Sequence, residues 1–214
     1  MLCALLSRRE PDTFGNGFSR LRGFTVVELM TVLAIAAVVA GVAFPSFLSL
    51  IEKRQVTSGA EQVAAFLSAV QVEAVSRNER LVVDYHRTDS DSWCVGVTTN
   101  TSAPFCDCTQ TDESASDFCA IDSNPRVLRS TNLTYPDVLA AVSGTDVSDS
   151  KLGFDPVRGL TGEPTNNFLV GDVASFDFVS YGGLYALNVD VGPTGRVHIC
   201  SDASNTHVPG YQQC

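Results

Sequence analysis

The most apolar stretch of the chain runs from Phe24 to Ile51 and contains one charged residue, Glu28. It is longer than the roughly 20 apolar residues that a helix needs to cross a lipid bilayer, so it predicts a membrane-spanning helix. An ionised carboxylate at the centre of a bilayer costs about 2.5–3.5 kcal/mol, and Glu28 therefore needs a partner. Gly41 and Pro45 weaken a helix late in this stretch and mark either a segment able to melt or an ordinary tolerated kink.

Beyond Ile51 the apolar residues become periodic instead of continuous. They follow the i, i+3, i+4, i+7 spacing of an amphipathic helix at Val63, Phe66, Leu67, Val70 and Ala74. We therefore expect one helix from about Thr25 to Arg77, with Asn78 as its stop. Its first half, residues 24–51, would lie in the membrane, and its amphipathic half, residues 52–78, would pack on a globular head.

After Asn78 the hydrophobic period changes from 3.6 to two, which is typical of strands. Strands are predicted at Arg80–His86, Trp93–Val97, Arg126–Ser130, Lys151–Phe154, Phe168–Val170, Ser175–Val179, Leu184–Val189 and Val197–Cys200. Turns are predicted at Asp155-Pro156, Asn166-Asn167, Tyr181-Gly182-Gly183 and Gly192–Gly195. The chain is thus expected to have an α+β fold, in which a long N-terminal helix packs on a small antiparallel β-rich head, residues 79–214.

The charges and the cysteines of the sequence predict the compartment in which this head lies. The net charge is −10 for the whole chain and −12 once the arginine-rich residues 1–23 are set aside, which disfavours nucleic acid as a default partner. Arg20 and Arg22 place the N-terminal side of the membrane helix in the cytoplasm and the head outside. Six cysteines follow the membrane segment: Cys94, Cys106, Cys108, Cys119, Cys200 and Cys214. Their even number predicts three disulfides in an oxidising compartment, with 15 pairings left open.

The junction before the apolar segment carries a specific motif. Gly23-Phe24-Thr25-Val26-Val27-Glu28-Leu29-Met30, followed by a long apolar helix, resembles the cleavage and assembly signature of type IV prepilins and type II secretion pseudopilins. The resemblance implies that residues 1–23 are a leader, that a prepilin peptidase cuts after Gly23, and that Phe24 is the new, N-methylated terminus. The Phe24 amine would then reach Glu28 of a neighbouring subunit. Pro45 also matches the family and is an assembly candidate.

Three further segments resemble one branch of that family. The helix end Phe66–Asn78, the hairpin Gly195-Arg196-Val197-His198-Ile199-Cys200 and the tail Gly210–Cys214 are similar to the GspH/FimT group of minor pilins and pseudopilins. The tail predicts a Cys200–Cys214 disulfide that closes a C-terminal loop, residues 200–214. A second loop, residues 100–124, is polar and is expected to be held by disulfides.

The resemblance implies a non-catalytic minor pilin that assembles with other pilins into a type IV pilus. It would be anchored in the cytoplasmic membrane, with its head in the periplasm, before it enters the filament. One alternative is a type II secretion minor pseudopilin, a GspH-like subunit in protein secretion. Another is a DNA-binding minor pilin that acts in natural transformation.

Few residues suggest chemistry of their own. His198, Cys200, His207 and Cys214 match no common zinc spacing, and no nucleophile elbow or phosphate loop occurs, so we expect no metal, no cofactor and no catalysis. Arg196 is the candidate DNA contact, since some FimT-type pilins bind DNA through a cationic Gly-Arg hairpin. DNA binding needs several phosphate contacts. The fold would have to bring Arg126, Arg129, Lys151 or Arg158 beside Arg196 to supply them.

Overall fold

The computed structural model describes residues 23–87, 92–99, 105–132, 139–143, 151–162 and 174–214. They form two compact units, one up to Phe44 and one from Pro45 to Cys214. Helix α1 (Val26–Arg77) begins in the first unit and ends in the second, and it is continuous through Gly41 and Pro45. The predicted strand at residues 168–170 and the predicted Asn166-Asn167 turn lie outside the described residues.

Both ends of α1 are set by local hydrogen bonds. Thr25 precedes the helix, and its Oγ1 accepts a hydrogen bond from the Glu28 amide at 3.2 Å, as an N-cap residue does. At the other end, Asn78 takes a left-handed conformation (φ 53°). The Asn78 amide donates to the Val75 carbonyl and the Glu79 amide to the Ala74 carbonyl, which is a Schellman C-cap. The predicted helix and its Asn78 stop are therefore present.

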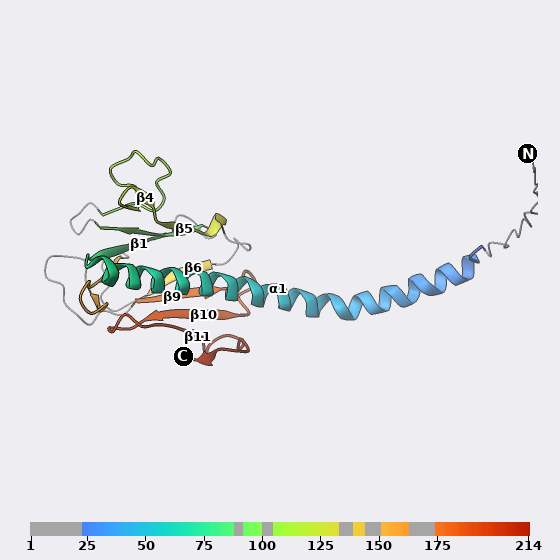
Figure 1. Ribbon diagram of the computed structural model, residues 1–214. Helices are drawn as coiled ribbons and strands as arrows, with labels where there is room; N and C mark the ends of the chain where they lie inside the picture. Colours follow the sequence, from blue (N-terminus) through green and yellow to red (C-terminus); the bar gives the residue numbers. More distant parts are fainter. Residues whose placement is uncertain (1–22, 88–91, 100–104, 133–138, 144–150, 163–173) are drawn as a thin grey trace, which may run out of the picture. The chain divides into compact units, whose positions relative to one another are not determined.

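Two five-stranded sheets form the head (Figure 1). The first has the order β5-β2-β1-β7-β8, with β5 at Val127–Arg129, β2 at Trp93–Thr98, β1 at Leu81–Arg87, β7 at Lys151–Phe154 and β8 at Thr161–Gly162. The second has the order β12-β11-β10-β9-β6, with β12 at Gln212–Gln213, β11 at Val197–Ser201, β10 at Ala186–Val191, β9 at Ala174–Val179 and β6 at Leu139–Ser143. Each named pair is antiparallel except β11 with β12. The predicted antiparallel α+β fold is thus confirmed.

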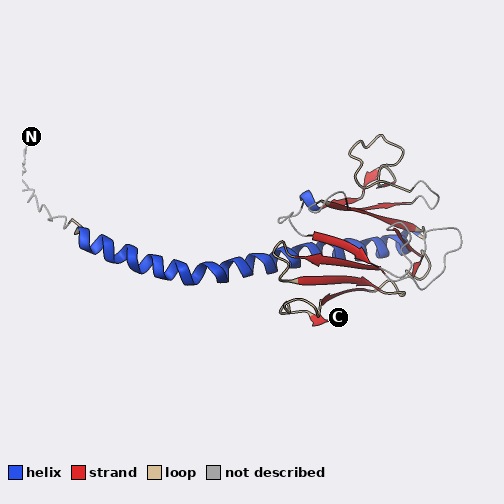
Figure 2. Cartoon of the chain, turned by 180° about the vertical axis from the view of Figure 1, so that it is seen from behind, coloured by secondary structure: helices blue, strands red, loops and turns tan. Residues whose placement is uncertain are grey.

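The second half of α1 packs against both sheets, as Figures 1 and 2 show from opposite sides. Its buried apolar side chains are Val56, Ala60, Val63, Leu67, Val70 and Ala74, spaced three or four apart. They include four of the five predicted core positions, and the fifth, Phe66, is half-buried against the same core. The apolar stripe of the sequence is therefore the face of α1 that meets the head.

Edge-on aromatic pairs join the two sheets across the core. Tyr85 of β1 meets Phe176 of β9, with ring centroids 5.8 Å apart, and Trp93 of β2 meets Phe178 of β9 at 5.5 Å. Strand β9 alternates buried and half-buried residues along its length, as the period-two pattern predicts for a strand with one face in the core.

Several features differ from the sequence expectation, including the short strands β8 and β12, which were not predicted. Strand β6 was not predicted, because Leu-Ala-Ala-Val-Ser lacks alternation and alanine is depleted in strands. The strand predicted at Leu184–Val189 lies two residues later, at Ala186–Val191. The shift occurs because the Ser180 hydroxyl accepts hydrogen bonds from the backbone amides of Leu184 and Tyr185, which hold both residues at the turn. The predicted loop 100–124 also contributes to a short ladder of β3 (Ala120–Ile121) with β4 (Asn124–Pro125).

Candidate functional site

The N-terminal half of α1 presents an apolar surface with no packing partner among the described residues of its own unit. All its described side chains from Phe24 to Phe44 are exposed, including Phe24 at 80% and Val42 at 77%. Within the described part of the chain, α1 is the helix long and apolar enough to cross a membrane. Exposed apolar area of this extent marks a surface that meets lipid or other apolar helices.

Glu28 lies in the first turn of this surface, on an exposed position three residues after the capping Thr25. Its carboxylate pairs with no cation of the described residues. The hydroxyl of Thr31 donates to the Glu28 carbonyl at 2.9 Å, so the neighbouring polar side chain serves the backbone and not the carboxylate. The helix dipole favours a negative charge in the first turn, but Glu28 still has the hydrogen-bonding capacity to accept an ammonium group.

Two disulfides gather four buried cysteines at one place. Cys94 of β2 pairs with Cys108, and Cys106 pairs with Cys119. A methyl group at Gly96 of β2 would overlap the Cys119 side chain, so the two bridges lie directly on the strand and require a glycine there. The 106–119 segment, which the sequence predicts as a loop held by disulfides, is thereby fastened to the first sheet.

Two acidic residues near these bridges have shifted pKa values for opposite reasons. Burial raises the pKa of Asp84 on β1, and the nearby Lys151 ammonium opposes the shift in part. The pKa of Asp107 is lowered, because its carboxylate accepts hydrogen bonds from the Thr109 hydroxyl at 2.7 Å and the Thr109 amide at 2.8 Å. Asp107 is thus a turn-forming acceptor within the disulfide loop.

The third disulfide joins Cys200 of β11 to the C-terminal residue Cys214, as the sequence predicted. In the set of His198, Cys200, His207 and Cys214, the two cysteine sulfurs are therefore bonded to each other and are not free thiolates. Cys200 is buried and Cys214 is exposed. The short parallel pairing of β12 with β11 follows from this bridge, since it brings the end of the chain alongside residues 200 and 201.

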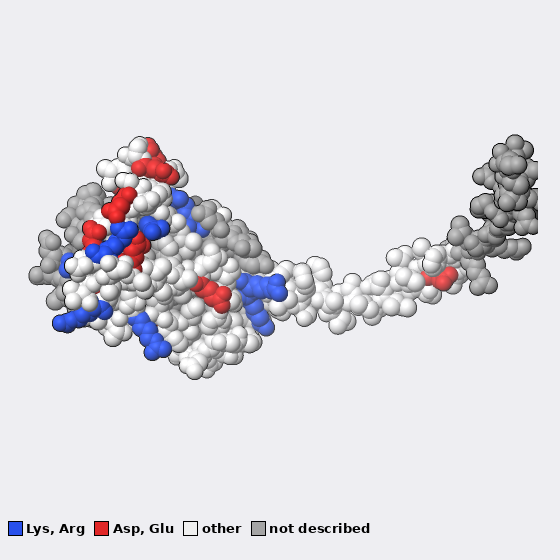
Figure 3. Space-filling model, viewed as in Figure 1, with Lys and Arg blue, Asp and Glu red and all other residues white. Residues whose placement is uncertain are grey.

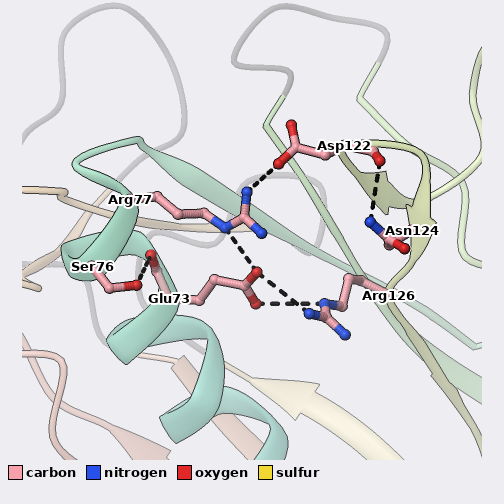
Figure 4. Close-up of polar contacts among 6 residues, drawn as sticks. All are labelled: Glu73, Ser76, Arg77, Asp122, Asn124 and Arg126. Carbon is pink, nitrogen blue, oxygen red and sulfur yellow. Dashed lines mark hydrogen bonds and ion pairs between the residues drawn. The ribbon is translucent and has the colours of Figure 1, made fainter.

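The C-terminal end of α1 is joined to the β3–β4 turn by an ion-pair cluster (Figure 4). Glu73 accepts from Arg77 at 2.9 Å on the same helix and pairs with Arg126 at 3.5 Å. Arg77 also pairs with Asp122, which sits in the turn with φ 49°. Hydrogen bonding to Asp122 raises the pKa of Arg77. Arg126 is thus committed to a carboxylate and is not a free cation.

Arg196 lies at the tip of the β10–β11 hairpin, and Gln71 of α1 fastens that tip. The side-chain amide of Gln71 donates to the Gly159 carbonyl at 2.9 Å and to the Thr194 carbonyl at 3.4 Å. The turn that contains Arg158 is thereby brought beside the turn that precedes Arg196. Sequence reasoning did not identify Gln71, because a half-buried glutamine on a helix gives no local signal of contacts so far along the chain.

A second residue strengthens this junction from the first sheet. Thr161 of β8 donates its amide to the Pro193 carbonyl at 3.1 Å and its hydroxyl to the Gly192 carbonyl at 2.9 Å. Gly195 has φ +76°, and a side chain added there would overlap the Gly159 carbonyl and Gln71, so the position favours glycine. Hydrogen bonds from α1 and β8 thus hold the β10–β11 turn in place.

The cations that DNA binding would need are not gathered there. Arg158 and Arg196 are exposed, and the turns that carry them both contact Gln71. Arg129, however, donates to the Gln110 carbonyl at 2.7 Å, and the Lys151 ammonium lies 4.9 Å from the Phe105 ring. Figure 3 likewise shows basic side chains in several separate places on this face of the head.

The immediate surroundings of Arg196 include an acid. A hollow of about 360 Å³ at the hairpin is lined by Asp190, Arg196 and His198, and Asp190 lies directly opposite His198 in the β-ladder. A carboxylate at this position opposes the approach of a phosphate. The hairpin therefore offers one or two cations beside an acid, and not the cationic surface that the resemblance suggested.

Polar contacts that the sequence did not reveal fasten the beginning of the amphipathic half of α1. Glu52 accepts a hydrogen bond from the Ser180 hydroxyl at 3.1 Å, and the Lys53 ammonium lies 5.0 Å from the centre of the Tyr185 ring. Tyr211 of the C-terminal loop donates to Glu61 at 2.6 Å. Burial, together with this hydrogen bond, raises the pKa of Tyr211 to about 12.

Comparison with known proteins agrees with this arrangement. A model of the prokaryotic N-terminal methylation motif matches residues 19–44. The processing motif, the exposed apolar helix and the α+β head define a protein of the pilin and pseudopilin class. The model of the type II transport protein GspH matches residues 59–195, and the chain belongs to this family.

Solved structures with a similar chain include two crystal forms of the type IV minor pilin FimU of Pseudomonas aeruginosa. They are 16% and 17% identical in sequence, with TM-scores of 0.43 and 0.41. The matches cover 72% and 69% of this chain and 97% of the FimU chain in both cases. No curated protein matches the chain significantly.

Proposed function

We propose that this protein is a non-catalytic minor subunit of a type IV pilus. The observation that carries the proposal is a methylation motif placed at the start of an exposed apolar helix, in a chain of the GspH family. A prepilin peptidase would cut after Gly23, and Phe24 would become the N-methylated terminus. The apolar half of α1 would hold the subunit in the cytoplasmic membrane, with the disulfide-bonded head in the periplasm, until it enters the filament.

In this proposal, Glu28 favours the transfer of the subunit from the membrane into the filament. Its carboxylate is costly in lipid and pairs with no cation of the described residues. Phe24 lies two residues before the start of α1, and we expect its free amine not to reach Glu28 of the same chain easily. The amine of a neighbouring subunit can reach it. Pairing between subunits would remove the cost of the buried charge only on assembly, which favours the filament over the free membrane protein. Pro45 is a further assembly candidate, because proline weakens the helix at a point where subunits pack.

Cleavage is tested by the intact mass of protein purified from membranes. We expect a chain that starts at Phe24 and carries one extra methyl group, and the variant Gly23→Val should stay uncut because the peptidase site no longer holds a glycine. A mature protein that begins at residue 1 would contradict the proposal.

Assembly is tested with Glu28→Gln in a strain that lacks the wild-type copy. The variant keeps the size of the side chain and removes its charge, so we expect normal cleavage and a normal head but less subunit in sheared filaments. The matched control is Glu79→Gln, an exposed acid of the head. Equal incorporation of Glu28→Gln and the control would refute the assigned role of Glu28.

The type II secretion pseudopilin is the second candidate, because the family model that matches the head is described as a type II transport protein. A deletion strain separates the two functions. Loss of surface pili with normal secretion supports the pilus, whereas retained pili with secreted enzymes trapped in the periplasm supports the pseudopilus. The DNA-binding alternative has less support, since Arg196 stands beside Asp190. Three of its four companion cations, Arg126, Arg129 and Lys151, are engaged in other contacts.

A further inference from the structure

A groove of about 810 Å³ follows α1 through its first turns in the unit from Pro45 to Cys214. Its floor is one face of the helix, with residues spaced three and four apart from Leu50 to Ala65, which is about 22 Å along the axis. Its opposite wall is Val208 and Pro209 of the C-terminal disulfide loop. The Tyr211–Glu61 hydrogen bond holds this wall against the helix.

Charge is distributed unevenly along the groove. Lys53 and Arg54 lie at its N-terminal end, and the hydroxyls of Thr57 and Ser58 follow one turn later on the same face. The Lys53 side chain is held by the Tyr185 ring, whereas Arg54 is exposed and forms no ion pair with any described residue. Glu61, the acid of the groove, is about 10 Å beyond Arg54 along the helix axis. The N-terminal end of the groove is therefore cationic and rich in hydrogen-bond donors.

The same end directly follows the membrane segment. Leu50 and Ile51 close the apolar run of the sequence. Glu52 follows and accepts a hydrogen bond from Ser180, and Lys53 and Arg54 come after it. Leu50 is 46% exposed and continues the apolar surface into the groove. In a chain anchored through this run, two cations and two hydroxyls thus lie at the level of the lipid headgroups.

We propose that the N-terminal end of this groove binds the headgroup of a membrane phospholipid. Arg54 and Lys53 would pair with the phosphodiester, a hydroxyl of Thr57 or Ser58 would donate to it, and Leu50 would contact the apolar part of the lipid. Charge complementarity favours a phospholipid over the apolar helix of a second subunit. Such a helix, residues 24–51, carries Glu28 as its one charge, at its far end, and would leave both cations without a partner.

The inference rests on the membrane anchoring in the proposed function and not on the choice between pilus and secretion system. It is tested by native mass spectrometry of the mature full-length chain, purified from membranes in mild detergent. We expect one phospholipid retained per chain. Arg54→Gln is the informative variant, because Arg54 forms no ion pair with the described residues of the head and its loss should not disturb folding. Loss of one cation from a phosphate site should lower the retained lipid about fivefold.

Arg158→Gln is the matched control, since it removes the same charge from an exposed position in a turn remote from the groove, and it should retain lipid as the wild type does. A wild-type chain without lipid, or equal retention in Arg54→Gln and the control, would overturn the proposal. So would cross-links from the groove to a second subunit in the same lipid-retaining sample. Loss of lipid in a strain that still assembles filaments would leave the proposed function intact, whereas failed cleavage with lipid retained would count against that function alone.

Discussion

The Gln71 junction provides the most direct test of how the head is held together. In the variant Gln71→Met, the side chain keeps nearly the same length and helix propensity, but the amide that donates to the Gly159 and Thr194 carbonyls is lost. Gly159 is buried, so its carbonyl would be left without a donor where water reaches it poorly. A buried acceptor that loses its partner costs about 1–3 kcal/mol, and the longer contact to Thr194 adds little.

The assay is urea unfolding of a soluble head, residues 52–214, followed by fluorescence of the single tryptophan, Trp93, which is buried against Phe178. We expect the free energy of unfolding to fall by about 2 kcal/mol in Gln71→Met. Gln62→Met is the control on the same helix, because the amide of Gln62 donates to Ser58 one turn away and to no other element of the described residues. Its expected loss is below about 0.5 kcal/mol. Equal stability of the two variants would refute the reasoning.

Three further outcomes follow from the contacts. The pKa of Tyr211 is raised to about 12 from 10.0, so its stabilising effect is complete below pH 10 and is lost as the pH rises to about 12. Tyr211→Phe should abolish that part of the loss of stability at alkaline pH, measured by urea unfolding at a series of fixed pH values. Replacing Cys200 and Cys214 together by serine should lower the free energy of unfolding by about 3 kcal/mol, and a loss below about 1 kcal/mol would mean that the bridge constrains little. The soluble head should not shift duplex DNA at about 150 mM salt and micromolar protein, whereas binding that persists there and disappears in Arg196→Ala would favour the DNA-binding alternative.

The features that the sequence predicted correctly are those encoded by neighbours along the chain. The ends of α1 follow from Thr25 and Asn78, which cap the helix through hydrogen bonds within a few residues. Strand positions follow from a period of two, and the methylation motif is a contiguous run of residues. Strand β6 was missed because its residues have little local preference for a strand. It forms through its pairing with β9, more than thirty residues later in the chain.

The sequence by itself thus determined an apolar helix long enough to cross a membrane, an α+β head, an even set of cysteines and a motif for processing. The tertiary structure alone decided how Cys94, Cys106, Cys108 and Cys119 pair and that Arg126 is bound to Glu73. It also decided that Gln71 joins two turns 88 and 123 residues away. These contacts depend on which surfaces meet when α1 and the two sheets bury their apolar faces together. That burial is collective, and no short stretch of sequence records which polar groups it brings within reach of one another.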